Sequence, residues 1–515
     1  MKLFTKTDWL FALTATFIVL LFGSVSLTTG IYPWGDDCAA YINEGIAIAE
    51  GKLPEQAQMN LYYHPSTLPQ EALESGSLVY VWGYPLLLSV IYKIVGFGAD
   101  TVIFYKLPLL ISLAFTAGAL VLLFRKRLPI QFSFVLSVIF CMSSYLFSAL
   151  NQLYSDLPFV FFCILTMLLM ECLCGLEEKG RNVIFIGIIY SLSLLFTYET
   201  RLSGSAVCVL AFVEHILLLY PLVKKSSNRK RLIFQHLLPY FLFGLLVLVS
   251  ERLLLLPATA NYSDFFVQID KSALFHYYLE MIYKYFKVIA REGNILFVFF
   301  LVGMMVTGFQ KKNIYLTVLL IGTIIVNCNL PYVQGPRYIY NVLPFVLLYA
   351  ANGLVLAADL IKKLSKKIAA NIKKDSVKTK LSSVIPQICK VLIVIVAVLV
   401  LINVCSYGAG KAYNNITHWG ENQKEDAYSF YAIEVYQYIN DETDPQSVIC
   451  FEKPRMLYLN TGHKSFRYGV NGHELSEADY YLKFKTGFNG ELEVELPDNE
   501  TVFENEMFVL YVLNK

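Results

Sequence analysis

The sequence is dominated by uninterrupted apolar runs of about 20 residues, the length that an α-helix needs to cross the hydrocarbon core of a bilayer. Because that core holds no water to satisfy exposed backbone groups, repeated runs of this length restrict the chain to a bundle of membrane-spanning helices. Of the 515 residues, 56% are hydrophobic and 16% are charged, whereas soluble domains carry about 25% charged residues. The net charge of +2 does not indicate nucleic acid as a partner.

About eleven of these runs qualify as membrane-spanning helices. They cover residues 8–27, 104–124, 130–149, 157–176, 182–198, 202–221, 233–256, 294–309, 313–330, 338–360 and 386–406. One further run, at 78–96, contains Pro85 and Lys93 and is ambiguous by composition alone. The sequence therefore predicts an α-helical polytopic membrane protein.

Basic residues decide the topology, because short cytoplasmic loops are enriched in Lys and Arg. If the N-terminus is inside and 78–96 is not a span, the cluster 125–127 and the lysine-rich segment 362–380 both fall inside. Counting 78–96 as a span moves these clusters outside. We therefore predict that 78–96 lies in the interface or re-enters, and that residues 28–103 and 407–515 are extracytoplasmic.

The last part of the chain is more polar than the rest and contains only short apolar stretches. Residues 432–439 have helical periodicity, while 447–451 and 508–513 have the composition of strands. We predict a multi-spanning domain over 1–406 and a small extracytoplasmic α/β domain over 407–515.

Two adjacent acidic residues, Asp36 and Asp37, follow the first predicted span. A short amphipathic helix after them places Asp37, Tyr41, Gly45 and Ala49 on one face, because residues four apart are neighbours on a helix. A catalytic carboxylate at the membrane surface is one interpretation. Helix capping is the other, because acidic residues are favoured in the first turn of a helix.

Three further charged residues stand at predicted outer helix ends. Asp156 precedes Pro158, a pattern that suits a helix N-terminus, but it is also an ionisable group at the membrane boundary. Arg201 and Arg337 lie outside, against the usual trend, and the guanidinium fork matches phosphate oxygens. The alternatives are contacts with lipid headgroups or an ion pair between Arg201 and the nearby Glu199.

Taken together, these motifs resemble those of the GT-C superfamily of membrane glycosyltransferases. The branch that they are most similar to includes protein O-mannosyltransferases and the bacterial enzymes that transfer aminoarabinose to lipid A. The resemblance covers most of the chain and rests on Asp36-Asp37, Tyr41, Ala49-Glu50-Gly51, Asp156, Thr200-Arg201 with Gly204, and Arg337-Tyr338 with Pro344-Phe345.

In that family the first-loop aspartate is the catalytic base, and the donor is a sugar on polyprenyl or dolichyl phosphate. Cys38 stands where family members often have glutamate, which leaves open whether Asp36 or Asp37 is the base. Helical spacing to Tyr41 favours Asp37. The resemblance implies Asp37, Asp36 and Asp156 as catalytic residues, and Arg201, Arg337 and Tyr41 as residues that bind the lipid phosphate and sugar.

The chemistry agrees with that reading. A phosphate leaving group is a stable anion that needs cations, whereas an acceptor hydroxyl needs a base, so one carboxylate with one or two arginines suffices for an inverting displacement. The expected partners are a polyprenyl-phosphate-sugar donor, membrane lipids, and a glycan, lipid or protein acceptor. No metal-ligand spacing is visible, although a divalent metal is compatible with the chemistry. The expected location is a bacterial plasma membrane, and the alternative function is a transporter or flippase of lipid-linked sugars.

Overall fold

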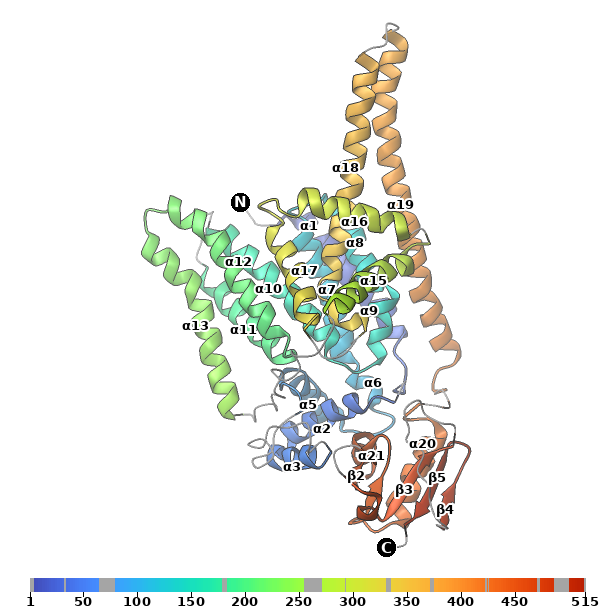
Figure 1. Cartoon of the computed structure of the whole chain (residues 1–515). Helices are drawn as coiled ribbons and strands as arrows, with labels where there is room; N and C mark the ends of the chain where they lie inside the picture. Colours follow the sequence, from blue (N-terminus) through green and yellow to red (C-terminus); the bar gives the residue numbers. More distant parts are fainter. Residues whose placement is uncertain are drawn as a thin grey trace.

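The computed structural model describes most of the chain. The described residues are 4–31, 34–63, 79–177, 183–253, 271–291, 293–329, 335–370, 375–421, 424, 426–469, 473–485 and 500–513. Over these ranges a large helical bundle carries a small sheet domain at one end (Figure 1).

Seven described helices are long and apolar enough to cross a membrane. They are α1 (Lys6–Val25), α6 with α7 (Val102–Tyr105 and Leu107–Phe124), α10 (Asp156–Glu177), α12 (Gly204–Lys225), α13 (Arg229–Leu253), α18 (Leu343–Ala370) and α19 (Asp375–Thr417). The prediction of a polytopic helical protein is confirmed.

Shorter or broken helices account for the other predicted runs. One is α8 (Ile130–Met142), which meets α9 (Ser144–Ser148) and η2 (Ala149–Asn151) at a 46° bend. The others are the shorter helices α11 (Ile184–Thr200), α16 (Gly293–Thr307) and α17 (Ile314–Asn327). Each of the eleven predicted runs thus coincides with a described helix, while the exact number of spans stays a prediction.

The ambiguous run 78–96 forms α5 (Gly83–Val95), a helix of 13 residues. At about 1.5 Å per residue it is shorter than the roughly 30 Å hydrocarbon core. It packs instead against α2 (Asp36–Glu50), where a Cβ at Gly45 would lie 3.0 Å from the Pro85 carbonyl oxygen. The short α3 (Leu53–Tyr63) follows α2, and α15 (Lys271–Ile289) precedes α16.

Two glycines bring α16 and α18 into backbone contact. A Cβ at Gly303 would collide with the Tyr349 carbonyl oxygen, and one at Gly353 would collide with the Phe299 carbonyl oxygen. Small residues allow such close crossings in membranes, where van der Waals packing rather than hydrophobic burial holds helices together.

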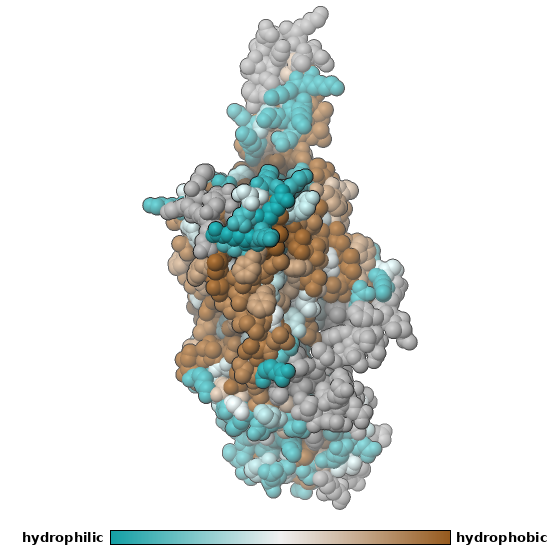
Figure 2. All heavy atoms as spheres, turned by 90° about the vertical axis from the view of Figure 1, so that its left-hand side faces the viewer, coloured by the Kyte–Doolittle hydropathy of each residue, from teal (hydrophilic) through white to brown (hydrophobic). Residues whose placement is uncertain are grey.

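The surface has the layering expected of a membrane protein. A hydrophobic belt lies between hydrophilic ends in the space-filling view (Figure 2). At one end α18 and α19 project beyond the bundle as a helical pair, where α18 carries Lys362, Lys363, Lys366 and Lys367. The sheet domain and the C-terminus lie at the opposite end (Figure 1).

The C-terminal region is an α/β unit, as the sequence predicts. Its elements are α20 (Phe430–Glu442), β1 (Val448–Cys450), α21 (Pro454–Thr461), β2 (Lys464–Phe466), η4 (Leu475–Glu477), β3 (Tyr480–Phe484), β4 (Thr501–Glu504) and β5 (Phe508–Val512). The strand order is β2-β1-β3-β5-β4, with β1 parallel to both neighbours and β5 antiparallel to both of its own.

The core of this unit contains a side chain from the first loop. The buried Trp34 indole, which follows α1, packs against the rings of Tyr436, Phe451, Phe484 and Phe508 at centroid distances of 5.2 to 6.3 Å. Because an aromatic side chain of this size buries a large area, Trp34 holds the C-terminal unit against the start of α2. The division of the chain at 406 stays a prediction, since α19 continues to Thr417.

Candidate active site

Asp36 lies at the junction of the bundle and the C-terminal unit. The N-cap of α2 is Gly35, which makes no side-chain cap, and Asp36 does not cap its own helix. Its Oδ1 instead accepts hydrogen bonds from the backbone N–H groups of Arg455 (3.0 Å) and Met456 (3.4 Å), in the first turn of α21. Burial raises the pKa of the Asp36 carboxyl. Asp36 therefore caps a helix more than 400 residues away in the chain.

Asp37 has a different environment. Its side chain is 44% exposed, compared with 20% for Asp36. The nearest cation is Arg455, whose Nη1 lies 3.9 Å from Asp37 Oδ1. Burial, together with the hydrogen bond to Asp37, raises the pKa of Tyr80 well above its ordinary value. Asp37 is thus held in place on one side and remains accessible on the other.

Arg455 belongs to the candidate site, although the sequence analysis did not single it out. It is 4% exposed and lies between the two aspartates, with Nε 3.8 Å from Asp36 Oδ2. Its carbonyl oxygen also accepts a hydrogen bond from the Asn43 amide of α2 at 3.3 Å. Nothing in the local sequence around Pro454 indicates this role, because the partners belong to the first loop.

Tyr41 connects α2 to the start of α10. Its hydroxyl is 3.0 Å from Ser155 Oγ, and its ring stacks on Tyr80 with centroids 4.0 Å apart. Tyr84 meets the same ring edge-on at 5.0 Å. The aromatic group forms a wall one turn along the helix from Asp37, so Tyr41 faces the site region as its spacing predicts.

Asp156 and Arg201 form an ion pair. Asp156 is the first residue of α10, and the Arg201 guanidinium, which follows α11, donates to its carboxylate. The guanidinium also packs over the ring of Tyr338 at 4.5 Å. The alternative in which Arg201 pairs with Glu199 is wrong, because Glu199 Oε1 accepts instead from Ser250 Oγ at 3.5 Å.

Arg337 lies beside this pair. It belongs to the turn η3 (Pro336–Ile339), and its guanidinium is over the rings of Tyr154 (4.9 Å) and Tyr338 (5.5 Å). Within the described ranges no carboxylate lies within 4.0 Å of it, so no direct ion pair neutralises its charge. Because both arginines pack on Tyr338, two guanidinium groups share one side of the site.

The donor set at this end does not resemble a metal centre. Among described residues, the one group of three His, Cys or carboxylate ligands close enough to share an ion is Cys174, His215 and His236, in the helical bundle. The acidic residues Asp36 and Asp156 are engaged by backbone N–H groups and by Arg201. The cationic side chains beside these carboxylates are the arginines Arg201 and Arg455.

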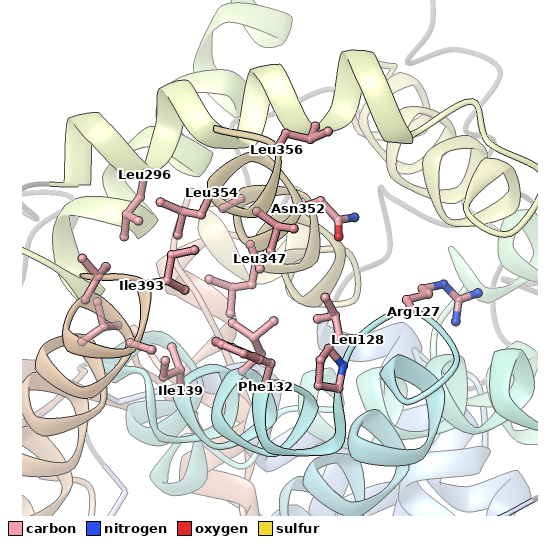
Figure 3. Close-up of a pocket in the computed structure, with 18 of the residues that line it drawn as sticks. Arg127, Leu128, Phe132, Ile139, Leu296, Leu347, Asn352, Leu354, Leu356 and Ile393 are labelled. Atoms are coloured by element: carbon pink, nitrogen blue, oxygen red, sulfur yellow. The ribbon is translucent and has the colours of Figure 1, made fainter. Parts of the chain in front are cut away.

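A separate cavity lies among α8, α16, α18 and α19 (Figure 3). It has a volume of about 340 Å³ and is lined mainly by apolar side chains, including Phe132, Ile139 and Leu347. Arg127 stands at its edge, on the side of the basic loops. None of the predicted catalytic residues lines this cavity.

No protein-family model matches the sequence, and no curated protein matches it either. Solved structures do match the fold. ArnT from Cupriavidus metallidurans bound to undecaprenyl phosphate superposes with a TM-score of 0.56 at 12% identity, covering 98% of each chain. The Archaeoglobus fulgidus oligosaccharyltransferase in the apo form gives 0.52 at 9% identity, over 93% of this chain and 70% of that one.

A second structure of the archaeal protein, AglB in complex with an inhibitory peptide and a dolichol-phosphate, gives a TM-score of 0.52 at 10% identity. It covers 92% of this chain and 69% of that one. The fold that the resemblance implied is thereby confirmed.

Proposed function

We propose that this chain is a membrane glycosyltransferase that moves a sugar from a polyprenyl-phosphate donor to an acceptor hydroxyl. The proposal is carried by an accessible carboxylate, Asp37, and a guanidinium that no carboxylate pairs among the described residues, Arg337, which stand on the same side of the site. Arg337 packs on the ring of Tyr154, whose hydroxyl would lie 2.9 Å from a Cβ at Gly35, two residues before Asp37. The fold supports the donor class, because two structures that share it contain undecaprenyl phosphate and dolichol-phosphate. Fold alone would not be enough, since one fold hosts many functions.

The arginines bind the leaving group. Arg337 and Arg201 contact the phosphate of the donor lipid, and their charge stabilises the negative charge that the phosphate gains as its bond to the anomeric carbon breaks. Arg201 is held by Asp156 and Tyr338. Asp156 is therefore a positioning residue for Arg201 in this scheme, rather than a second catalytic carboxylate.

Asp37 activates the acceptor. Its carboxylate takes the proton of the acceptor hydroxyl while the hydroxyl oxygen attacks the anomeric carbon from the face opposite the phosphate. One bond to the anomeric carbon forms as the other breaks, so the configuration inverts and the lipid phosphate departs as the anion. Asp36 keeps the C-terminal unit docked above Asp37, and Tyr41 supports the wall of the site.

The C-terminal unit orients the acceptor. It touches the site directly through Arg455, which lies within 4 Å of both aspartates. Binding of remote parts of an acceptor there would bring its hydroxyl to the base. This end of the molecule faces outside the cytoplasm in our proposal, because the basic loops lie at the other end. The proposed location of the protein is a bacterial plasma membrane. The acceptor is a glycan, a lipid or a protein.

The decisive experiment uses purified protein in detergent, with a polyprenyl-phosphate sugar as donor and mass spectrometry as the readout. A micelle has no two leaflets, so a flippase leaves the donor unchanged, whereas a transferase releases lipid phosphate to an acceptor or slowly to water. Mass spectrometry of lipid-linked sugars in a deletion strain identifies the donor by its accumulation. A panel of such donors that stays intact with the folded protein would reject the proposal.

A further inference from the structure

A cluster of metal-binding side chains lies inside the bundle, apart from the candidate active site. It consists of Cys174 on α10, His215 on α12 and His236 on α13. The Cys174 thiol and one ring nitrogen from each histidine all lie within 4.8 Å of one another. Three separate helices, which lie side by side in Figure 1, thus converge on one point.

The cluster is on the far side of the bundle from Asp37. Cys174 is near the end of α10, whose first residue Asp156 belongs to the active site, and His236 is near the start of α13, which follows the basic segment 224–231. The two histidines are 1% and 0% exposed. Polar groups so deep in a membrane domain are costly and need partners.

Hydrogen bonds among these residues leave some polar atoms without a partner. His215 Nδ1 is 2.8 Å from the Tyr240 hydroxyl, and His215 Nε2 is 2.9 Å from His236 Nδ1. Within the described part of the chain, however, His236 Nε2 and both carboxylate oxygens of Glu214 have no hydrogen-bond partner. Glu214 precedes His215 on α12 and is 1% exposed. Hydrogen bonds within the described part of the chain therefore do not satisfy all the buried polar atoms of this region.

We propose that Cys174, His215 and His236 bind a zinc ion that joins α10, α12 and α13. Zinc favours thiolate and imidazole ligands, at about 2.3 Å for sulfur and 2.0–2.1 Å for nitrogen in a tetrahedral arrangement. Such distances place two ligand atoms roughly 3.3–3.8 Å apart, so atoms already within 4.8 Å require only small side-chain rotations. The ion replaces the hydrogen bond between the two histidines.

The surrounding groups suit a bound zinc ion. With zinc on His215 Nε2, the Nδ1–H group donates to Tyr240, whose hydroxyl also lies 2.9 Å from the Tyr190 hydroxyl. An outer partner of this kind fixes the orientation of a metal-binding imidazole. Zinc with one thiolate carries a single positive charge, and the Glu214 carboxylate can offset it, which makes the whole assembly neutral inside the membrane.

The role of this ion is structural. In helix α13, 22% of the apolar stretch is buried inside the protein, so most of the helix makes no contact that ties it to α10. A zinc ion would tie α13 to α10, the helix that carries Asp156 at its other end. Removal of zinc should therefore lower the thermal stability of the protein before it affects any reaction at the active site.

The test measures metal in the full chain, purified in detergent through a tag without histidine. Wild type, incubated with Zn²⁺ and dialysed, should hold about one zinc per chain by mass spectrometry of the metal, and Cys174→Ser and His236→Gln should each lose most of it. The matched control is Cys172→Ser, on the same helix two residues away and outside the cluster, which should keep the ion.

If the variants fold poorly, cobalt binding to the wild-type protein provides the test instead. Wild type loaded with Co²⁺ should show the near-ultraviolet band of a thiolate bound to cobalt together with the visible bands of a tetrahedral site. A chelator should abolish both bands and lower the melting temperature. A wild type that holds no more zinc than the Cys174→Ser variant, or that lacks the thiolate band with cobalt, would overturn the proposal and leave a hydrogen-bonded network only.

Discussion

The two ends of the bundle carry the same kinds of charged side chains and use them differently. At the end with the basic loops, Arg125 Nε is 2.8 Å from Asp8 Oδ1, and Arg127 Nη2 is 2.5 Å from Glu171 Oε1. Arg127 also donates to the Lys312 carbonyl oxygen at 2.8 Å. These contacts fasten the loop after α7 to α1, α10 and the loop before α17, with each arginine matched by a carboxylate.

At the end with the C-terminal unit the pairing is incomplete. Asp156 holds Arg201 and Asp36 holds the first turn of α21, but Asp37 stays 44% exposed and Arg337 has aromatic rings, not carboxylates, as its described neighbours. A closed ion pair fixes structure, whereas an accessible carboxylate, and a guanidinium that no described carboxylate pairs, can interact with a ligand. We infer that the ion pairs at the end with the basic loops stabilise the bundle, whereas the charges at the end with the C-terminal unit are available to a ligand.

The strongest test of this contrast compares Asp37→Asn with Asp8→Asn. Loss of a general base typically lowers the rate by about 10²–10⁴, so Asp37→Asn should reduce transfer to that degree while expression and donor binding stay near normal. Asp8→Asn breaks the pair with Arg125 and should lower the melting temperature but leave the rate per folded molecule unchanged. Equal activities of the two variants would remove the distinction between the ends.

The next largest effect is expected at Arg337, which no carboxylate pairs within the described part of the chain. Hydrogen bonds to charged groups contribute about 1.5–3 kcal/mol, so Arg337→Ala should weaken donor binding by roughly 10- to 100-fold. Arg337→Lys should restore part of it, because lysine lacks the bidentate fork. Arg125→Ala at the other end is the control and should leave donor affinity unchanged in a titration with labelled lipid. Unaltered affinity in Arg337→Ala would assign phosphate binding to other groups.

A smaller effect is expected at Asp36, one residue from the proposed base. Asp36→Ala removes the cap of α21, a change worth about 0.5–2 kcal/mol, and should make the C-terminal unit more sensitive to limited proteolysis. Asp36→Asn keeps a side-chain oxygen that can accept from the Arg455 and Met456 N–H groups, so it should retain most of the stability and activity. If Asp36→Asn were as inactive as Asp37→Asn, Asp36 would share the role of base.

The smallest effect depends on pH and involves Glu44, on α2. Burial raises the pKa of its carboxyl to about 8 from 4.5. A raised pKa means that the folded state holds the proton longer than the unfolded state, so stability is lost as pH rises from about 4.5 through about 8. Glu44→Gln, which cannot ionise, should show a smaller fall in melting temperature between about pH 6 and pH 9.

The exposed Glu50, which pairs with Lys52 at 2.7 Å, provides the matched control for this measurement. Glu50→Gln should keep the pH dependence of wild type over the same range. If Glu44→Gln and Glu50→Gln follow the wild-type curve alike, the buried carboxyl does not control the alkaline limit of stability.

The helical bundle could be predicted because its cause is local. Each predicted run is long and apolar enough that the bilayer itself selects a helix, and α2 and the strands β1 and β5 follow from periodicity and composition in the same way. The short strand β2 and the helix α21 were not predicted from the sequence. They have few residues and depend on partners elsewhere for their stability.

In the candidate site, too, some features could be predicted from the sequence and others could not. Asp37, Asp156, Arg201 and Arg337 could be picked out as charges at helix ends, where a membrane protein rarely places them without reason. The pairing of these charges could not be predicted. Arg201 pairs with Asp156 rather than with Glu199, two residues away, and Asp36 accepts from a backbone more than 400 residues away.

The sequence by itself determined that this chain spans a membrane many times and that its unusual charges occur at helix ends, because hydropathy, helix length and loop charge act over one segment at a time. Only the tertiary structure decided that Asp37 stays accessible and that no described carboxylate pairs with Arg337. It also decided that Arg455 and Trp34 join the C-terminal unit to the first loop. These outcomes depend on contacts between residues distant in sequence, whose energies come from burial and mutual geometry.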